Sequence, residues 1–339
     1  MGWTSVEQSV EHLAVHGNSR LESCCLMKVI IQIPCFNEAE TLPLVLAQLP
    51  RELDGVDAVE WVVIDDGSQD GTADVARRHG VHAVVTHSQN RGLAAAFVTG
   101  IQTCLDRGAD IIVNTDAYNQ YCSCNIPDLI APILAGQADY VVGARPITDI
   151  EHFSFVKKLL QRIGSLVVRL ASNTDIPDAT SGFRAISRAS AMELRVFTQY
   201  TYTLETIIQA GQRGWRITWV PVEVNPPTRP SRLMRTIPEY IFRSVSTIIR
   251  VFVIYRPFRF FFISGSLLMS AGFMLALRFL WYYLNGKSGY VQSLIFASML
   301  CAMGFQVIMT GFVVDLLSVN RRILENIQSR LRADSSKNG

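Results

Sequence analysis

Strand-like and helix-like patterns alternate along the chain from residue 28 to residue 145. Runs rich in Val and Ile predict strands at residues 28–34, 59–67, 81–87, 109–116 and 138–145. Apolar positions at helical spacing predict helices between them, at residues 40–49, 70–80 and 93–105. Strands that alternate with helices form a mostly parallel sheet covered on both faces, so the pattern predicts an α/β fold.

Two long apolar runs change the pattern in the last third of the chain. They cover residues 260–284 and 290–319, and the link between them reads "NGKSG". A helix needs about 20 residues to cross the hydrocarbon core of a bilayer, and both runs are longer than that. The sequence therefore predicts an integral membrane protein with a two-span hairpin; a pair of buried core helices is the alternative.

Basic residues flank this hairpin at its outer ends. The arginines are Arg243, Arg250, Arg256 and Arg259 before the first run, and Arg321, Arg322, Arg330 and Arg332 after the second. The connecting link carries only Lys287. Because positive charge stays on the cytoplasmic side, this distribution predicts that the large domain is cytoplasmic.

The segment before the hairpin, residues 231–259, has the pattern of a basic amphipathic helix. Apolar side chains recur at steps of three or four residues, at Met234, Ile237, Ile241, Val245, Ile248 and Phe252. Arginines and other polar residues occupy another face. Such a helix is suited to the headgroup layer of a membrane, although an ordinary surface helix has the same pattern.

These patterns divide the chain into five parts. Residues 1–26 are polar and mixed in charge, without the apolar run of a signal peptide, and are expected to be a disordered extension. The α/β domain covers residues 27–230 and the interfacial segment residues 231–259. The transmembrane hairpin covers residues 260–320, and a basic cytoplasmic tail covers residues 321–339.

Composition adds a few exclusions. The net charge of +2 gives no reason to expect a nucleic-acid partner. The seven cysteines form no CxxC pair and no evident disulfide framework, so reduced thiols are expected. The histidines form no HExxH motif, which argues against a zinc site.

Acidic residues gather where the predicted strands end. These residues are Glu38, Asp65, Asp66 and Asp116, and Arg145 follows the fifth strand. In open α/β sheets the ligand lies beyond the carboxyl ends of the strands. Grouped carboxylates there hold magnesium or manganese together with substrate phosphates, whereas any single one can instead cap a helix or a turn. Because GxGxxG and P-loop motifs are absent, the pattern indicates a nucleoside diphosphate joined to a donor group.

Seven sequence motifs resemble those of a known family. They are "IPCFNEAETL", "VVIDDGSQDGT", "NRGLAAAF", "NTDAYNQY", "DATSGFRAISR", "YTLETIIQAG" and "NPPTRPSRL". With the hairpin, they resemble the inverting glycosyltransferases of family 2, which have the GT-A (Rossmann-like) fold. Within that family, the chain looks like the polyprenyl-phosphate glycosyltransferases, which include dolichyl-phosphate mannose synthase and bacterial undecaprenyl-phosphate glucosyltransferases. The resemblance covers residues 28 to about 325.

The resemblance implies a role for each matching position. The nucleotide sugar would contact Pro34, Phe36, Glu38, Asp65, Asp66, Asp116, Glu205, Arg229, Ser231 and Arg232, with Asp66 on the base. Arg145 would face phosphate charge, and Ser181 and Arg184 would bind the acceptor phosphate. Lys157, Lys158 and Arg162 are further candidates there, although a solvated basic face explains them equally well. The catalytic group would then be Asp116, Arg145, Arg184 and Glu205.

The most consequential departure from the family pattern is at Tyr118; Leu93, where many relatives carry a lysine, and the segment "CSCN", which has no acidic residue, also depart from it. The family has Asp-x-Asp where this chain has Asp116, Ala117 and Tyr118, and the second aspartate is the direct metal ligand. A neutral phenol, with a pKa of about 10, is a poor ligand for magnesium. Asp116 with Gln120 could still hold Mg²⁺ or Mn²⁺. The activity could instead be weak, metal-independent or lost.

Three functions follow from these patterns. The first is a hexosyltransferase that uses a UDP- or GDP-sugar, with UDP-glucose preferred, and a polyprenyl phosphate such as undecaprenyl or dolichyl phosphate. The second is a degenerate relative that binds nucleotide or lipid, or serves as a scaffold, without turnover. A processive polysaccharide synthase is disfavoured because the chain has no QxxRW motif and only two spans. A homo-oligomer is left open.

Overall fold

The computed structural model describes residues 26–146, 165–166, 168–169, 172, 174–196, 202–226, 246, 249–250, 253, 257–286 and 291–337, with side chains up to residue 320. The predicted N-terminal extension and most of the amphipathic segment at 231–259 lie outside these residues. So do several predicted site residues: Lys157, Lys158, Arg162, Arg229, Ser231 and Arg232.

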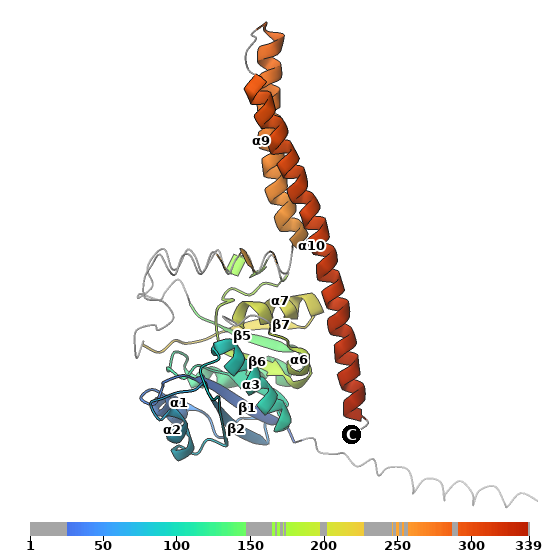
Figure 1. The fold of residues 1–339 in the computed structure, drawn as a ribbon. Helices are drawn as coiled ribbons and strands as arrows, with labels where there is room; N and C mark the ends of the chain where they lie inside the picture. Colours follow the sequence, from blue (N-terminus) through green and yellow to red (C-terminus); the bar gives the residue numbers. More distant parts are fainter. Residues whose placement is uncertain are drawn as a thin grey trace, which may run out of the picture.

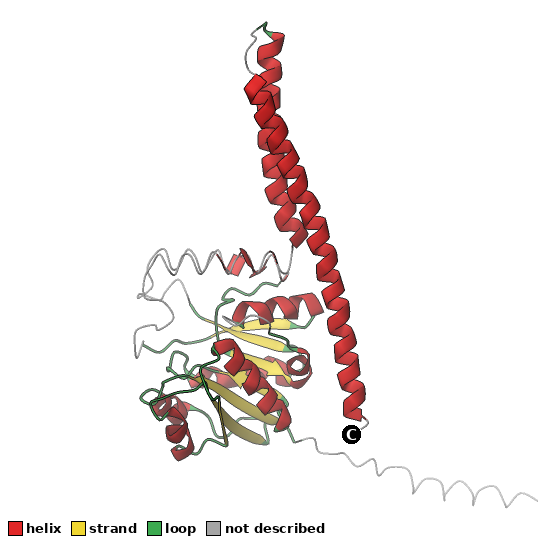
Figure 2. Ribbon diagram, in the orientation of Figure 1, coloured by secondary structure: helices red, strands yellow, loops and turns green. Residues whose placement is uncertain are grey.

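The described strands form one seven-stranded sheet in the order β3-β2-β1-β4-β6-β5-β7 (Figure 2). The strands are β1 (Lys28–Cys35), β2 (Ala58–Asp65), β3 (Ala83–Thr86), β4 (Ile111–Asn114), β5 (Tyr140–Ala144), β6 (Arg184–Ser187) and β7 (Ile217–Pro221). Strand β6 runs antiparallel to β4 and β5, and all other pairs are parallel. The predicted mostly parallel α/β sheet is therefore confirmed.

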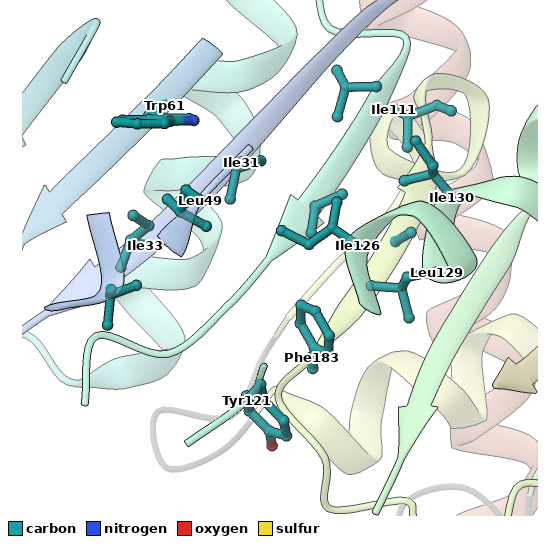
Figure 3. Close-up of a cluster of buried hydrophobic side chains, with 14 of the residues drawn as sticks. Ile31, Ile33, Leu49, Trp61, Ile111, Tyr121, Ile126, Leu129, Ile130 and Phe183 are labelled. Atoms are coloured by element: carbon teal, nitrogen blue, oxygen red, sulfur yellow. The ribbon is translucent and has the colours of Figure 1, made fainter. Parts of the chain in front are cut away.

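Helices cover both faces of the sheet (Figure 1). They are α1 (Leu42–Gln48), α2 (Thr72–Arg78), α3 (Leu93–Asp106), α4 (Ile126–Leu134), α6 (Arg188–Glu193) and α7 (Thr203–Arg213). The alternation of side chains along a strand separates two buried clusters. Ile31 and Ile33 pack with Leu129 and Ile130 of α4 on one face, as Figure 3 shows. Ile30 packs with Phe97 of α3 on the other face.

The two apolar runs form the long helices α9 (Pro257–Leu284) and α10 (Val291–Lys337), which project from the sheet domain (Figure 1). Residues 257–284 and 291–320 are long and apolar enough to cross a membrane, and little of either helix is buried. The low burial contradicts the alternative of two core helices, because core helices would be covered by the rest of the fold.

Glycines set the distance between these two helices. A Cβ atom added to Gly265 would lie 2.6 Å from the carbonyl oxygen of Gly304, and one added to Gly304 would lie 2.7 Å from that of Gly265. The backbones are therefore in direct contact, and no side chain fits between them. Close backbone approach through small residues is a common way for membrane helices to pack.

We expect Gly304→Val to separate α9 from α10. The added side chain meets backbone, which cannot move aside as a side chain can, and such overpacking costs about 1–3 kcal/mol. The measurement is thermal unfolding of the full chain in detergent. Ala302→Val on the exposed side of the same helix is the matched control; equal melting temperatures for the two variants would contradict this packing.

Candidate active site

The candidate site lies at the edge of the sheet where β1, β2, β4 and β5 end. Because β6 is antiparallel, its first residue lies opposite the last residue of β4, in the pair Asn114 and Arg184. The loop before β6 therefore joins the loops that follow the other strands. The strand ends were expected from the sequence, and the structure adds Asp178 and Gly182 from this loop.

Asp116 follows β4 and lies against Gly182. A Cβ atom added to Gly182 would be 3.0 Å from Oδ1 of Asp116 and 3.2 Å from the hydroxyl of Tyr202. Asn114 fixes this contact, since its Nδ2 donates to the Gly182 carbonyl oxygen at 2.7 Å. Burial raises the pKa of Asp116 and Glu38 adds to that effect, while Tyr118 and Arg145 oppose it.

Tyr118 occupies the position of the second aspartate and is bonded to Gln120. Its hydroxyl donates to Oε1 of Gln120 at 2.7 Å. Burial raises the pKa of Tyr118 far above its usual value, and the charge of Asp116 raises it further. The phenol therefore stays protonated and acts as a hydrogen-bond donor at neutral pH.

These residues do not fit a tightly held divalent cation. Asp116 offers a carboxylate, but its neighbour at the usual second position is a neutral hydroxyl, and Oε1 of Gln120 is already bonded to that hydroxyl. Magnesium prefers carboxylate oxygens. Among the described residues, no set of three His, Cys, Asp or Glu ligands gathers around Asp116. The predicted metal pair of Asp116 and Gln120 is therefore not supported by this geometry.

Both side-chain oxygens of Asp66 accept hydrogen bonds from other residues of the α/β domain. Oδ1 accepts from Nδ1 of His87 at 2.7 Å and from the backbone N–H of Arg91, and Oδ2 accepts from that of Gly92. These bonds hold the turn that leads into α3. Asp65 instead uses Oδ1 for the backbone N–H of Ser68 at 3.0 Å, and Oδ2 accepts no hydrogen bond in the part of the chain described here.

Residues at the end of β1 and just after it form the part of the candidate site next to Asp65. Pro34 is buried within the strand and Glu38 is buried beyond it, whereas 40% of Phe36 is exposed. Glu38 accepts from the hydroxyl of Thr41 at 2.6 Å, and its carbonyl oxygen accepts from the first turn of α1. The structure thus brings the predicted nucleotide residues of β1 and β2 to one edge.

Arg145 is held by a buried ion pair that the sequence analysis missed. Its Nε donates to Oδ2 of Asp178 at 2.6 Å, and its Nη2 donates to Oδ1 at 3.1 Å. Burial alone would raise the pKa of Asp178, but the charge and hydrogen bonds of Arg145 keep that pKa below its usual value. Nη2 also donates to the hydroxyl of Thr180, while Nη1 makes no hydrogen bond to the described residues.

The predicted role of Arg184 in the acceptor-phosphate site is wrong. Its side chain is fully buried, with 0% exposed. The guanidinium donates to the carbonyl oxygens of Ala179, Ser181 and Thr203 and to the hydroxyls of Tyr140 and Thr206. Because none of the side chain is exposed, a ligand phosphate cannot reach the guanidinium in this structure. Arg184 instead connects β6 with the preceding loop and with α7.

Ser181 and Glu205 are also buried. The Ser181 hydroxyl donates to the hydroxyl of Tyr121 at 3.4 Å, and the backbone N–H of Gly182 donates to the same atom at 3.0 Å. Figure 3 shows Tyr121 beside Phe183, with which it stacks at 5.0 Å between ring centroids. Glu205 lies in the first turn of α7, with 4% exposed.

The expectation of reduced thiols fails at one pair. Cys122 and Cys124 are joined as a disulfide at the start of the short helix η2 (Ser123–Asn125), and their Cα atoms are 5.2 Å apart. Their CxC spacing is shorter than the CxxC pattern, which is why this pair was not expected from the sequence. Cys35, Cys104 and Cys301 are free.

Comparison with known proteins identifies the family. The model of "Glycosyl transferase family 2" matches residues 30–195. An undecaprenyl-phosphate mannosyltransferase of Micrococcus luteus is 30% identical over 206 residues, which cover 58% of this chain and 83% of the relative. The chain belongs to glycosyltransferase family 2.

Two further comparisons bear on this family 2 glycosyltransferase. A polyprenol monophosphomannose synthase of Mycolicibacterium smegmatis is 26% identical over 58% of this chain and 76% of the relative. A glucosyl-3-phosphoglycerate synthase of Mycobacterium tuberculosis, solved with Mn²⁺ and UDP, has a TM-score of 0.53 and 20% identity over 67% of this chain and 79% of its own. That likeness concerns the fold, and it confirms the predicted GT-A architecture.

We expect Arg184→Ala to act on stability. Truncation leaves several buried oxygens without a donor, which costs about 2–4 kcal/mol of unfolding free energy. The measurement is chemical unfolding of the full chain in detergent, beside the exposed control Arg51→Ala. An unchanged midpoint for Arg184→Ala would contradict the structural role.

Proposed function

We propose that this glycosyltransferase is membrane-bound and moves a hexose from a nucleotide sugar to a polyprenyl phosphate, with inversion at the anomeric carbon. One combination carries the proposal: a family 2 fold with an acidic strand-end site is joined to two helices long enough to span a bilayer. The relatives named for undecaprenyl-phosphate and polyprenol mannosyl transfer support the same reading. Their names favour a mannosyl donor over the UDP-glucose preferred from the sequence.

The donor would be bound by the residues that follow β1, β2 and β4. Phe36 is partly exposed and offers a face to the base or ribose, with Pro34 and Glu38 beside it. We assign the base contact to Asp65 rather than Asp66, because Asp65 keeps one oxygen without a bond to the described residues. Asp66 would support the turn before α3. Arg229 and Arg232 remain candidates for the donor side.

The acceptor needs little activation. A lipid phosphate is already an anion at neutral pH, so no general base has to remove a proton, unlike for a sugar hydroxyl. One of its oxygens would attack the anomeric carbon while the bond from that carbon to the diphosphate oxygen breaks on the opposite face. Arg145 would place positive charge close to these anions. Lys158 and Arg162 remain candidates for the acceptor phosphate.

The hairpin would bring this site to the membrane surface. Arginines outside the apolar runs and a single lysine in the link favour a cytoplasmic α/β domain. The lipid phosphate lies at that surface, so the acceptor would reach the site without leaving the bilayer. The two apolar helices would thus account both for membrane attachment and for the use of a lipid acceptor.

No step of this reaction is assigned to a cation. A bound divalent ion would supply charge neutralisation of the diphosphate, and Mn²⁺ accompanies UDP in the structurally similar synthase. In this chain Asp116 would be the only described carboxylate at that position, and Tyr118 and Gln120 are bonded to each other. The transfer experiment therefore compares magnesium, manganese and chelator.

The deciding experiment measures transfer by the full chain in detergent to undecaprenyl phosphate. It uses labelled GDP-mannose, UDP-glucose and UDP-N-acetylglucosamine, each with magnesium, manganese or chelator. We expect transfer from one donor, with inverted configuration in the product. Folded protein that transfers from none of them would favour the second candidate, a degenerate binding protein, which the departure at Tyr118 makes worth testing.

Gly182→Ala tests the position of Asp116 in this reaction. The added methyl group would meet both Asp116 and the hydroxyl of Tyr202, so Asp116 must shift by a few tenths of an ångström. We expect kcat/KM to fall about tenfold or more with the melting temperature nearly unchanged, since small displacements at reacting groups are costly. Ala131→Ser, at an exposed position of α4, is the control for a small added group away from Asp116. Equal kcat/KM for both variants would show that the position of Asp116 does not affect the reaction.

A further inference from the structure

Tyr118 changes the charge of the donor site as well as its ligands. An aspartate there would add a second negative charge beside Asp116, and a diphosphate could then approach only with a cation between them. The protonated phenol adds no charge. The repulsion that a cation would have to offset is therefore smaller in this chain by one full charge.

The Tyr118 hydroxyl also places a hydrogen-bond donor at the position of the family's second aspartate. Its O–H now donates to Oε1 of Gln120 at 2.7 Å, and the same hydroxyl also lies within hydrogen-bonding reach of the Asp116 carboxylate. A phosphate oxygen carries negative charge and is a stronger acceptor than a neutral amide oxygen. A bound diphosphate can therefore take over this hydrogen bond, and Gln120 would keep its amide N–H groups as further donors.

Arg145 lies within electrostatic reach of both Asp116 and Tyr118. Its ion pair with Asp178 uses Nε and Nη2, so the guanidinium is fixed while Nη1 makes no hydrogen bond to the described residues. A fixed arginine whose Nη1 is not bonded to the described residues, together with a neutral hydroxyl, would supply positive charge and a proton to a diphosphate.

We propose that this site binds its nucleotide diphosphate without a divalent cation, and that the Tyr118 hydroxyl, supported by Gln120 and Arg145, donates to the diphosphate in the cation's place. The inference rests on the proposed function, because it assumes a nucleotide-sugar donor at Asp116. Under this proposal Tyr118 binds the nucleotide of an active enzyme, and its presence does not indicate that activity has been lost.

The test is calorimetric titration of the full chain in detergent with UDP and with GDP, each in chelator and in millimolar magnesium. For the nucleotide that binds, we expect the wild-type Kd to differ by less than about threefold between the two conditions. Tyr118→Phe keeps the ring and removes only the hydroxyl; it should weaken binding about tenfold in chelator. Tyr118→Asp should bind the nucleotide poorly in chelator. With magnesium its binding should be tighter than in chelator by about tenfold or more, because the substitution restores a second carboxylate.

Tighter wild-type binding with magnesium by tenfold or more, or an unchanged Kd for Tyr118→Phe, would overturn the proposal. In either case transfer activity of the wild type would leave the proposed function standing. If folded wild-type protein binds neither nucleotide under either condition and transfers no sugar, the proposed function fails together with this inference.

Discussion

The buried guanidinium of Arg184 is the interaction on which the arrangement of the site depends. It is the first residue of β6, the antiparallel strand between β4 and β5, and its donors reach the loop before that strand and the first turns of α7. A buried charge is tolerated only where hydrogen bonds surround it. These bonds fix the loop that carries Asp178 and Gly182. Arg145 and Asp116 contact that loop, so the arrangement of the sheet edge depends on a residue that is itself fully buried.

Much of the fold could be predicted from the sequence. The strands at 28–34, 59–67, 81–87, 109–116 and 138–145 and the helix at 93–105 follow from periodicity and from Val- and Ile-rich composition, because these reflect burial of each element against the sheet. Strands β6 and β7 were missed. β6 is four residues long and begins with an arginine, and β7 is partly exposed, so neither has the apolar signal of a central strand.

The site could be predicted only in part. Strand ends point to a shared edge, and the structure brings Asp65, Asp116 and Arg145 to that edge as expected. The sequence could not separate residues that face a ligand from those that hold the fold, because Asp66 and Arg184 have the same residue types as binding groups. Their partners, His87 and Gly92 for Asp66 and Thr206 for Arg184, are distant in sequence. Only the three-dimensional contacts distinguish the two roles.

The direct backbone contact between Gly265 and Gly304 has a mechanical consequence. Two helices in such close contact cannot slide or separate easily, so in a bilayer they would respond to its thickness as one body, by tilting together. α9 begins at Pro257, so a change in tilt would move the point at which the chain enters the first of these helices. If the chain is membrane-bound and its acceptor is a lipid phosphate, as proposed, the thickness of the host membrane would then influence how the enzyme meets its acceptor.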